Sequence, residues 1–269
     1  MNGRDGASRI VLNAYLLLFF AYLFLPLLIM VAAAFNDYPQ PSVTVWRGFT
    51  WKWFPALVAD QRMWQGLIHS LLIALMVIGV SVPAGLAGAL LITRLESRFN
   101  GVLYGIMVSP ILTPGIILGV STLIFWRELG VDGGLFLAAI AQSTFIAAYC
   151  MLMFMARLQR QDRTLEEAAL DLGASHFQVF RRITLPFLLP TVATAVVIAF
   201  LQSIENYNTT VFSIGAQYTL VTEIGSRLRF GVSPVVNVIG VIFIAITIAA
   251  ASVYVVLRQR EDRRRLAAG

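Results

Sequence analysis

Polar side chains are concentrated in one short segment of an otherwise apolar chain, residues 202–210. The segment reads Gln-Ser-Ile-Glu-Asn-Tyr-Asn-Thr-Thr, and at helical spacing one face collects Gln202, Glu205, Asn206 and Thr209. A polar face exposed to lipid is costly, so we expect this one to face the interior of a helix bundle or a water-filled path. Hydrogen bonding between helices and the lining of a solute path explain it equally well.

The chain lacks the residue sets of several common enzyme classes. A phosphate-binding loop needs Lys followed by Ser or Thr, but the single lysine, Lys52, is followed by Trp53. There is no G-x-S-x-G or H-E-x-x-H motif, and the only histidines are His69, expected at a membrane interface, and His176, expected in a solvated or partner-facing loop. The one cysteine, Cys150, lies in an apolar run and is expected to be a small buried hydrophobe. We therefore predict no catalytic residue, no metal site and no enzymatic activity in this chain.

The composition places these residues in a membrane protein. Charged residues make up only 13% of the chain, against about 25% in soluble domains, and the apolar residues form long runs without charge. A spanning helix needs roughly 20 such residues. We predict an all-α integral membrane protein that forms a single transmembrane domain over residues 1–269. Its six expected helices span about 10–36, 70–93, 101–126, 133–156, 187–210 and 234–257. The first run is too long for the core of a signal peptide and is expected to be an uncleaved helix.

Basic residues set the expected orientation. With the N-terminus inside, the cytoplasmic segments hold 14 of the Lys and Arg residues and the outer segments hold six. Because Lys and Arg favour the cytoplasmic side, we expect both termini in the cytoplasm.

Prolines and two outer loops add detail to this plan. Pro83 in the second span, and Pro110 and Pro114 in the third, are expected to bend their helices, with bundle geometry favoured over a gate. The last outer loop, 213–233, is expected to hold a short helix along the membrane. The first outer loop, 37–69, carries tryptophans typical of an interface, namely Trp46, Trp51, Trp53 and Trp64.

The cytoplasmic loop 157–186 has the most informative local pattern. Thr164 followed three residues later by Glu167 is a capping box, which predicts that a helix begins there, and Glu166 adds negative charge at its positive end. The helix also carries the small residues Ala168 and Ala169. A short helix of this kind is expected to dock into a groove on a partner.

An elbow and a second helix follow. Gly173 fits the left-handed position that ends a helix, and Ser175 with Gln178 forms a second capping box. Pro186 stands where the fifth span should begin.

This loop resembles a known motif. Glu167-Ala168-Ala169, then Gly173 after three residues, then Ile183-Thr184-Leu185-Pro186 after nine more is similar to the "EAA" loop of the permeases of binding-protein-dependent ABC importers. Segments 157–190 and 231–237 resemble the spermidine/putrescine branch of that family, specifically its second permease subunit. The resemblance implies a type I ABC importer permease fold. It also implies that this loop docks on the ATPase. The residues of this chain that would form the docking element are Glu166, Glu167, Ala168, Ala169, Gly173 and Ala174.

The same resemblance implies the partners. They are a second permease, expected to be a paralogue, a dimer of ATP-binding subunits, and an extracytoplasmic solute-binding protein, all at the bacterial inner membrane. The chain itself is expected to bind no cofactor and no nucleic acid, since ATP and magnesium are used by the partner ATPase.

The solute is expected to be a polyamine or another small amino-bearing compound, such as an amino-acid derivative, an opine or an aminophosphonate. Polyamine permeases carry an acidic pair where this chain has Glu205-Asn206, and an acidic residue after the Ser-Pro that here precedes Val235. This chain keeps one of those three carboxylates.

Other readings stay open at the level of sequence. An ion-coupled secondary transporter or a channel subunit usually carries ionisable groups inside the bilayer, and here only Glu205 is a candidate. A membrane-anchored structural subunit without a path is a more distant alternative. Glu205 is expected either to line the path or to pair with Arg227 or Arg229 as a structural tie.

Overall fold

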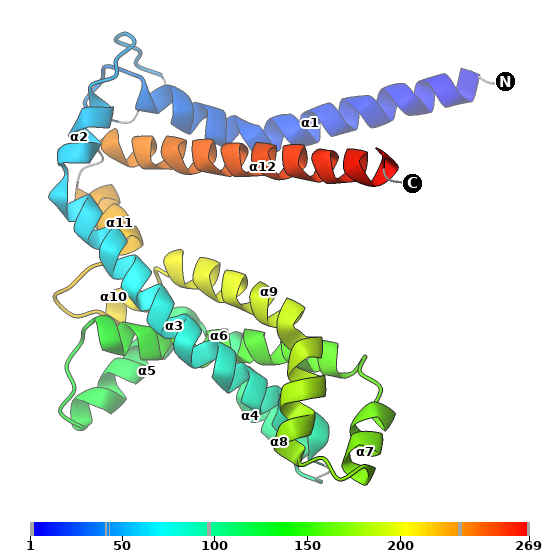
Figure 1. The fold of residues 1–269 in the computed structure, drawn as a ribbon. Coiled ribbons are helices and arrows are strands. Elements are labelled where there is room, and N and C mark those ends of the chain that lie inside the picture. The colour runs from blue at the N-terminus through cyan, green and yellow to red at the C-terminus, as the bar shows by residue number, and fades with distance from the viewer. Residues whose placement is uncertain (1–2, 41, 43, 96–97, 231–232, 268–269) are drawn as a thin grey trace. The chain divides into compact units, whose positions relative to one another are not determined.

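The computed structural model describes residues 3–40, 42, 44–95, 98–230 and 233–267, which are helical almost throughout (Figure 1). The chain divides into two units, residues 62–225 and the two ends of the chain, up to 61 and from 226. Five helices are long and apolar enough to cross a membrane, or six spans if one bent pair of helices counts as a single span. The prediction of an all-α protein with about six transmembrane helices is confirmed.

In the unit formed by the two ends of the chain, the first and last helices lie side by side. They are α1 (Gly3–Ala34) and α12 (Val235–Ala267). Met30 packs so closely on Gly240 that a Cβ there would collide with the methionine sulfur. Most apolar side chains of α1 are exposed within this chain, as expected of a helix that contacts lipid or another subunit.

The segment after α1 is held by one buried amide. Asn36 donates from Nδ2 to the carbonyl oxygens of Ser42 and Val45, both at 2.7 Å, and its Oδ1 accepts from the backbone N–H of Arg47 at 3.0 Å. This loop leads into the short helix α2 (Trp53–Ala59). Phe54 of this helix packs in an aromatic cluster with Phe35, Phe49 and Trp51.

In the second unit, the best-buried long helix is α6 (Leu135–Leu158). It packs beside α9 (Leu185–Ile204) and against α3 (Gln61–Arg94). A Cβ on Gly85 of α3 would lie 2.5 Å from the Cβ of Cys150, so the absence of a side chain lets the two helices approach closely. Cys150 is fully buried, as predicted.

The third predicted span, 101–126, is two helices. They are α4 (Asn100–Leu112) and α5 (Gly115–Glu128), bent by 106° relative to each other. Thr113 at the break is extended, with ψ of 129°, because the ring of the following Pro114 disfavours a helical residue before it. Pro83, in contrast, lies inside the uninterrupted helix α3.

Other boundaries also differ from the predicted spans. The helix α3 begins at Gln61, not near residue 70, and α9 ends at Ile204, not near residue 210. Before α9 the chain forms a π-helical turn, η1 (Phe180–Thr184). After it come α10 (Thr210–Ser213) and α11 (Leu220–Phe230), so the last loop does contain the expected short helix.

Candidate coupling loop and solute pathway

The loop between α6 and α9 folds as a helix, an elbow and a second helix. The helices are α7 (Thr164–Asp171) and α8 (His176–Val179), and Gly173 between them has φ of +86°. In the second capping box, Ser175 Oγ accepts from the N–H of Gln178 at 3.3 Å, and Gln178 Oε1 accepts from the N–H of Ser175 at 2.8 Å. The left-handed glycine and this second box are confirmed.

The first capping box is wrong. Thr164 is already the first helical residue of α7, and the cap hydrogen bond comes from Asp162, whose Oδ1 accepts from the backbone N–H of Thr164 at 3.0 Å. That backbone N–H, and secondarily the threonine hydroxyl, hold the pKa of Asp162 below its usual value because they stabilise the ionised carboxylate.

Glu166 ties α7 to the ends of two other helices. Its Oε1 lies 2.7 Å from Nη2 of Arg94, the last residue of α3, and accepts from the hydroxyl of Thr184 at 2.8 Å, where η1 ends. The side chains of Glu166 and Arg94 are only 15% and 24% exposed, so water screens this ion pair little. Glu166 therefore joins α7 to the end of α3 and to the turn that precedes α9.

The outer face of the loop is apolar and exposed. Leu172 is 90% exposed and Phe177 is 69% exposed, and Glu167 and Ala168 are also exposed. Beside them lies a groove that is lined by the predicted Ala169 and Ala174, by Leu172, Val179 and Ile183, and by the polar Gln178 and Arg182. Leu172 lies outside the candidate spans, whereas Phe177 lies at the start of the candidate span His176–Ile204. A large apolar side chain that is exposed outside the spans is typical of a surface that a partner covers.

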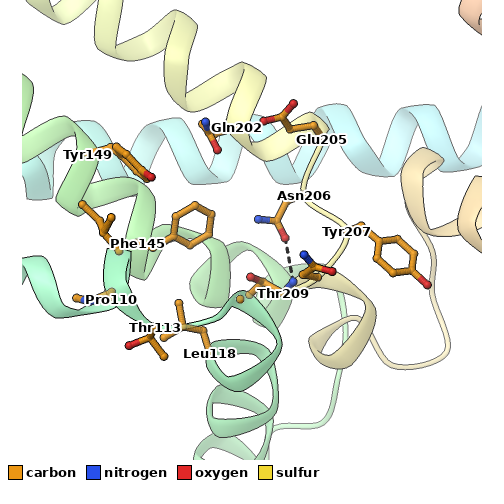
Figure 2. Close-up of a pocket in the computed structure, with 13 residues that line it drawn as sticks. Pro110, Thr113, Leu118, Phe145, Tyr149, Gln202, Glu205, Asn206, Tyr207 and Thr209 are labelled. Carbon is orange, nitrogen blue, oxygen red and sulfur yellow. Dashed lines mark hydrogen bonds between the residues drawn. The ribbon is translucent and has the colours of Figure 1, made fainter. Parts of the chain in front are cut away.

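A second site lies at the other end of α9, where a cavity of about 310 Å³ opens beside the bend between α4 and α5 (Figure 2). Gln202, Glu205, Asn206 and Thr209 all line it, as the polar pattern predicted. The helical-face argument is nevertheless wrong in detail, because α9 ends at Ile204 and the last two of these residues lie in the turn before α10. The turn, not a continuous helix, brings them to the cavity.

Asn206 holds this turn in place. Its Oδ1 accepts from the backbone N–H of Thr209 at 3.2 Å (Figure 2) and from that of Thr210 at 3.3 Å. Behind it, Gln142 of α6 donates to the hydroxyl of Thr210 at 2.7 Å and accepts from Ser203 of α9 at 2.6 Å. The hydrogen bonds that Asn206 accepts give it a structural role at the cavity wall, and the buried hydrogen bonds of Gln142 join α6 to α9 and α10 behind it.

The cavity contains residues that the polar pattern did not single out. Phe145 and Tyr149 of α6 pack edge to face, with ring centroids 6.3 Å apart, and both line the cavity (Figure 2). Their spacing of four residues places them on one helix face, which is the signal that was present in the sequence. Together with the exposed carboxylate of Glu205, aromatic rings offer a favourable environment for an organic cation.

The pairing of Glu205 with Arg227 or Arg229 stays a prediction, because Glu205 belongs to residues 62–225 and both arginines belong to the other unit. Within that other unit, the guanidinium of Arg227 forms a two-point ion pair with Asp60, with distances of 2.6 and 3.0 Å. Within the described part of residues 62–225, no ion pair engages Glu205.

Comparison with known proteins identifies the family. Residues 79–263 match the family described as binding-protein-dependent transport system inner membrane component. The chain belongs to this family. It is therefore the membrane permease component of such a transport system, and this membership decides against the ion-coupled transporter and the channel.

Two curated relatives of the permease match over most of its length. The spermidine/putrescine transport system permease protein PotC of Haemophilus influenzae is 30% identical over 238 residues, which cover 88% of this chain and 92% of the relative. The putrescine transport system permease protein PotI of Escherichia coli K12 is 31% identical over 260 residues, which cover 93% of this chain and 91% of the relative.

A solved structure shows the same fold. The permease resembles a chain of a bacterial ABC transporter involved in the import of the polysaccharide alginate, with a TM-score of 0.69 at 17% identity over 96% of this chain and 98% of that chain. The expected ABC importer permease fold is confirmed.

Proposed function

We propose that this permease forms half of the solute path of an ATP-driven importer, and that α7 and the Gly173 elbow dock on a cytoplasmic ATP-binding subunit. The observation that carries the proposal is the pairing of an exposed apolar face, with Leu172 and Phe177, and an internal tie from Glu166 to two long helices. A partner that covers the face moves α7, and the tie passes that motion on to α3 and α9.

In the proposed assembly this permease works with three kinds of partner. A second permease, a paralogue, completes the path, a dimer of ATP-binding subunits binds ATP and magnesium, and an extracytoplasmic binding protein delivers the solute. The family description, which names a binding protein and the inner membrane, supports this composition. The excess of basic residues in alternate segments supports an orientation with both termini in the cytoplasm.

The proposed solute is a polyamine or another small amino-bearing compound. Two observations support it: the relatives are named for spermidine and putrescine, and the cavity combines the carboxylate of Glu205 with the rings of Phe145 and Tyr149. One carboxylate in the wall suits one ammonium group at a time.

Reconstitution tests this proposal. The permease and its partner subunits are placed in liposomes with the binding protein outside and ATP inside, and uptake of radiolabelled putrescine and spermidine is measured. ATP-dependent uptake is expected. Uptake that needs an ion gradient and no ATP would contradict the importer, whereas ATP-dependent uptake of a different solute alone would contradict only the polyamine.

The docking face has its own test. Leu172→Glu places a charge on the proposed contact and is expected to abolish co-purification of the ATP-binding subunit, while Leu95→Glu, at another exposed leucine, leaves it unchanged. Retention of the ATP-binding subunit by Leu172→Glu would contradict docking at this face.

A further inference from the structure

A third cavity, of about 360 Å³, lies where two spanning helices end together. Arg94 is the last residue of α3 and Leu158 is the last residue of α6, and both line it. Both helices are candidate membrane spans. Because hydrophobic spans end where the headgroup region begins, we expect the cavity to lie near the level of the lipid headgroups. It shares no residue with the cavity at Glu205.

One buried amide in the cavity wall has a donor without an acceptor. Arg94 donates from Nη2 to Oε1 of Gln161 at 3.3 Å. Since a guanidinium only donates, this contact fixes the amide with its oxygen toward Arg94. Gln161 is only 8% exposed, and its Nε2 finds no partner among the described residues. An unsatisfied buried donor is unfavourable, so the site calls for an acceptor.

The charges around the cavity favour an anion. Among the residues that the structure describes, two guanidinium groups line it, those of Arg94 and Arg163, and no carboxylate does. Glu166 binds Arg94 from α7 but is not part of the wall, and the carboxylate of Asp162 is occupied with the N–H of Thr164. Arg163 donates from Nη2 to the backbone carbonyl of Thr93 at 2.5 Å, which holds its guanidinium at the cavity. An oxyanion would accept a hydrogen bond from Nε2 of Gln161 and lie beside the two positive charges.

The rest of the wall consists of Thr93 and Gln159 and of an apolar side formed by Ile92, Met155 and Leu158. A free phosphate ion would leave this apolar side in contact with water, whereas a lipid covers it with its glycerol and first methylene groups. We propose that this cavity binds the phosphate group of an anionic phospholipid. Arg94 also holds Glu166 of α7, so a bound lipid steadies the end of α3 to which the coupling loop is tied.

Lipid retention tests the site. The full-length permease with its partner subunits is reconstituted into nanodiscs of phosphatidylcholine containing phosphatidylglycerol, extracted in mild detergent and analysed by native mass spectrometry. The wild type is expected to retain phosphatidylglycerol. Arg163→Gln is expected to lower retention about tenfold, which is typical of the loss of one charge-assisted hydrogen bond. Gln161→Leu is expected to lower it as well.

Arg160→Gln is the matched control, because Arg160 is exposed, lies three residues away and does not line the cavity. Equal losses in Arg160→Gln and Arg163→Gln would reflect general charge attraction and overturn the site. Inorganic phosphate is then added to the wild type: displacement of the lipid by millimolar phosphate would overturn the lipid as the source of the anion. Thermal melting of each variant verifies folding, and if Gln161→Leu fails to fold, Arg163→Gln decides.

Discussion

At the residue scale, the adjacent carboxylates Glu166 and Glu167 have different surroundings. Successive residues of a helix point about 100° apart, so the side chain of Glu166 reaches Arg94 and Thr184 while that of Glu167 is exposed. In the proposed mechanism Glu166 transmits motion within the chain and Glu167 is accessible to the ATP-binding subunit.

We expect Glu166→Gln to lower transport several-fold while the ATP-binding subunit still co-purifies. The amide can still accept from Thr184, but Arg94 loses its charged partner, at a cost of about 1 kcal/mol for a pair with this partial exposure. Uptake, ATPase activity and co-purification are measured together, with Glu167→Gln as the exposed control. ATPase activity that continues without transport is the signature of a broken tie, and unchanged uptake would contradict the role of Glu166.

Among the described residues, Glu205 is the one carboxylate in the cavity wall at the far end of α9. We expect Glu205→Gln to raise the half-saturating solute concentration about tenfold, since a charge-assisted contact is worth about 1.4 kcal/mol or more. Assembly should be normal, because no ion pair engages this side chain in the described part of its unit. The control is Glu128→Gln, at an exposed carboxylate that ends α5 and lies outside this cavity. Wild-type uptake kinetics in Glu205→Gln would remove Glu205 from the path.

The cavity could be predicted from the sequence only in part. Gln202 and Glu205 stand out because polar residues are rare in an apolar run. Phe145 and Tyr149 do not, because aromatic residues at helical spacing are equally common on lipid-facing surfaces. Their place in the wall depends on how α6 packs against α9, which no local pattern encodes.

At the element scale, the bend between α4 and α5 shapes the cavity. The sequence predicts a bend at Pro114, but it does not predict that the angle between the two helices is 106°. The angle allows α5 to pack against the turn before α10: a Cβ on Gly119 would lie 2.5 Å from the carbonyl oxygen of Thr209, and one on Gly115 would lie 3.0 Å from its hydroxyl. Two glycines on one face of α5 therefore let the bent helix reach the polar turn.

The elbow at Gly173 gives the element-scale prediction. Its φ of +86° is accessible to glycine at little cost, costs an L-residue about 1–2 kcal/mol, and is closed to proline. We expect Gly173→Ala to reduce transport and Gly173→Pro to abolish it, with the chain still inserted and the ATP-binding subunit lost from the proline variant. Gly79→Ala, in open space within α3, is the control and should be silent. Full transport by Gly173→Pro would show that coupling does not need the elbow.

At the scale of the whole molecule, charge-free runs predict the spans, but not where the helices end. The helix α3, for example, begins at Gln61, so its helical structure starts in the polar sequence that precedes the apolar run. Ties between distant residues have no local signature at all: Glu166 and Arg94 are 72 residues apart, and Asp60 and Arg227 are 167 apart. Such pairs become visible only when the helices are packed.

The orientation of the whole chain rests on its basic residues, and cysteine labelling tests it. Cys150 is the only cysteine and is fully buried, so a Cys150→Ala background removes the native thiol. Into this background we place Ala59→Cys, at the exposed end of α2, or Arg160→Cys, in the exposed turn before α7. Both positions lie outside the spanning helices and avoid the Asp60–Arg227 ion pair and the docking face.

An impermeant maleimide is expected to label Ala59→Cys in intact spheroplasts, and Arg160→Cys only after the membrane is opened, because the basic segments face the cytoplasm. The reverse pattern would place the coupling loop on the side without ATP and contradict the orientation and the docking proposal together.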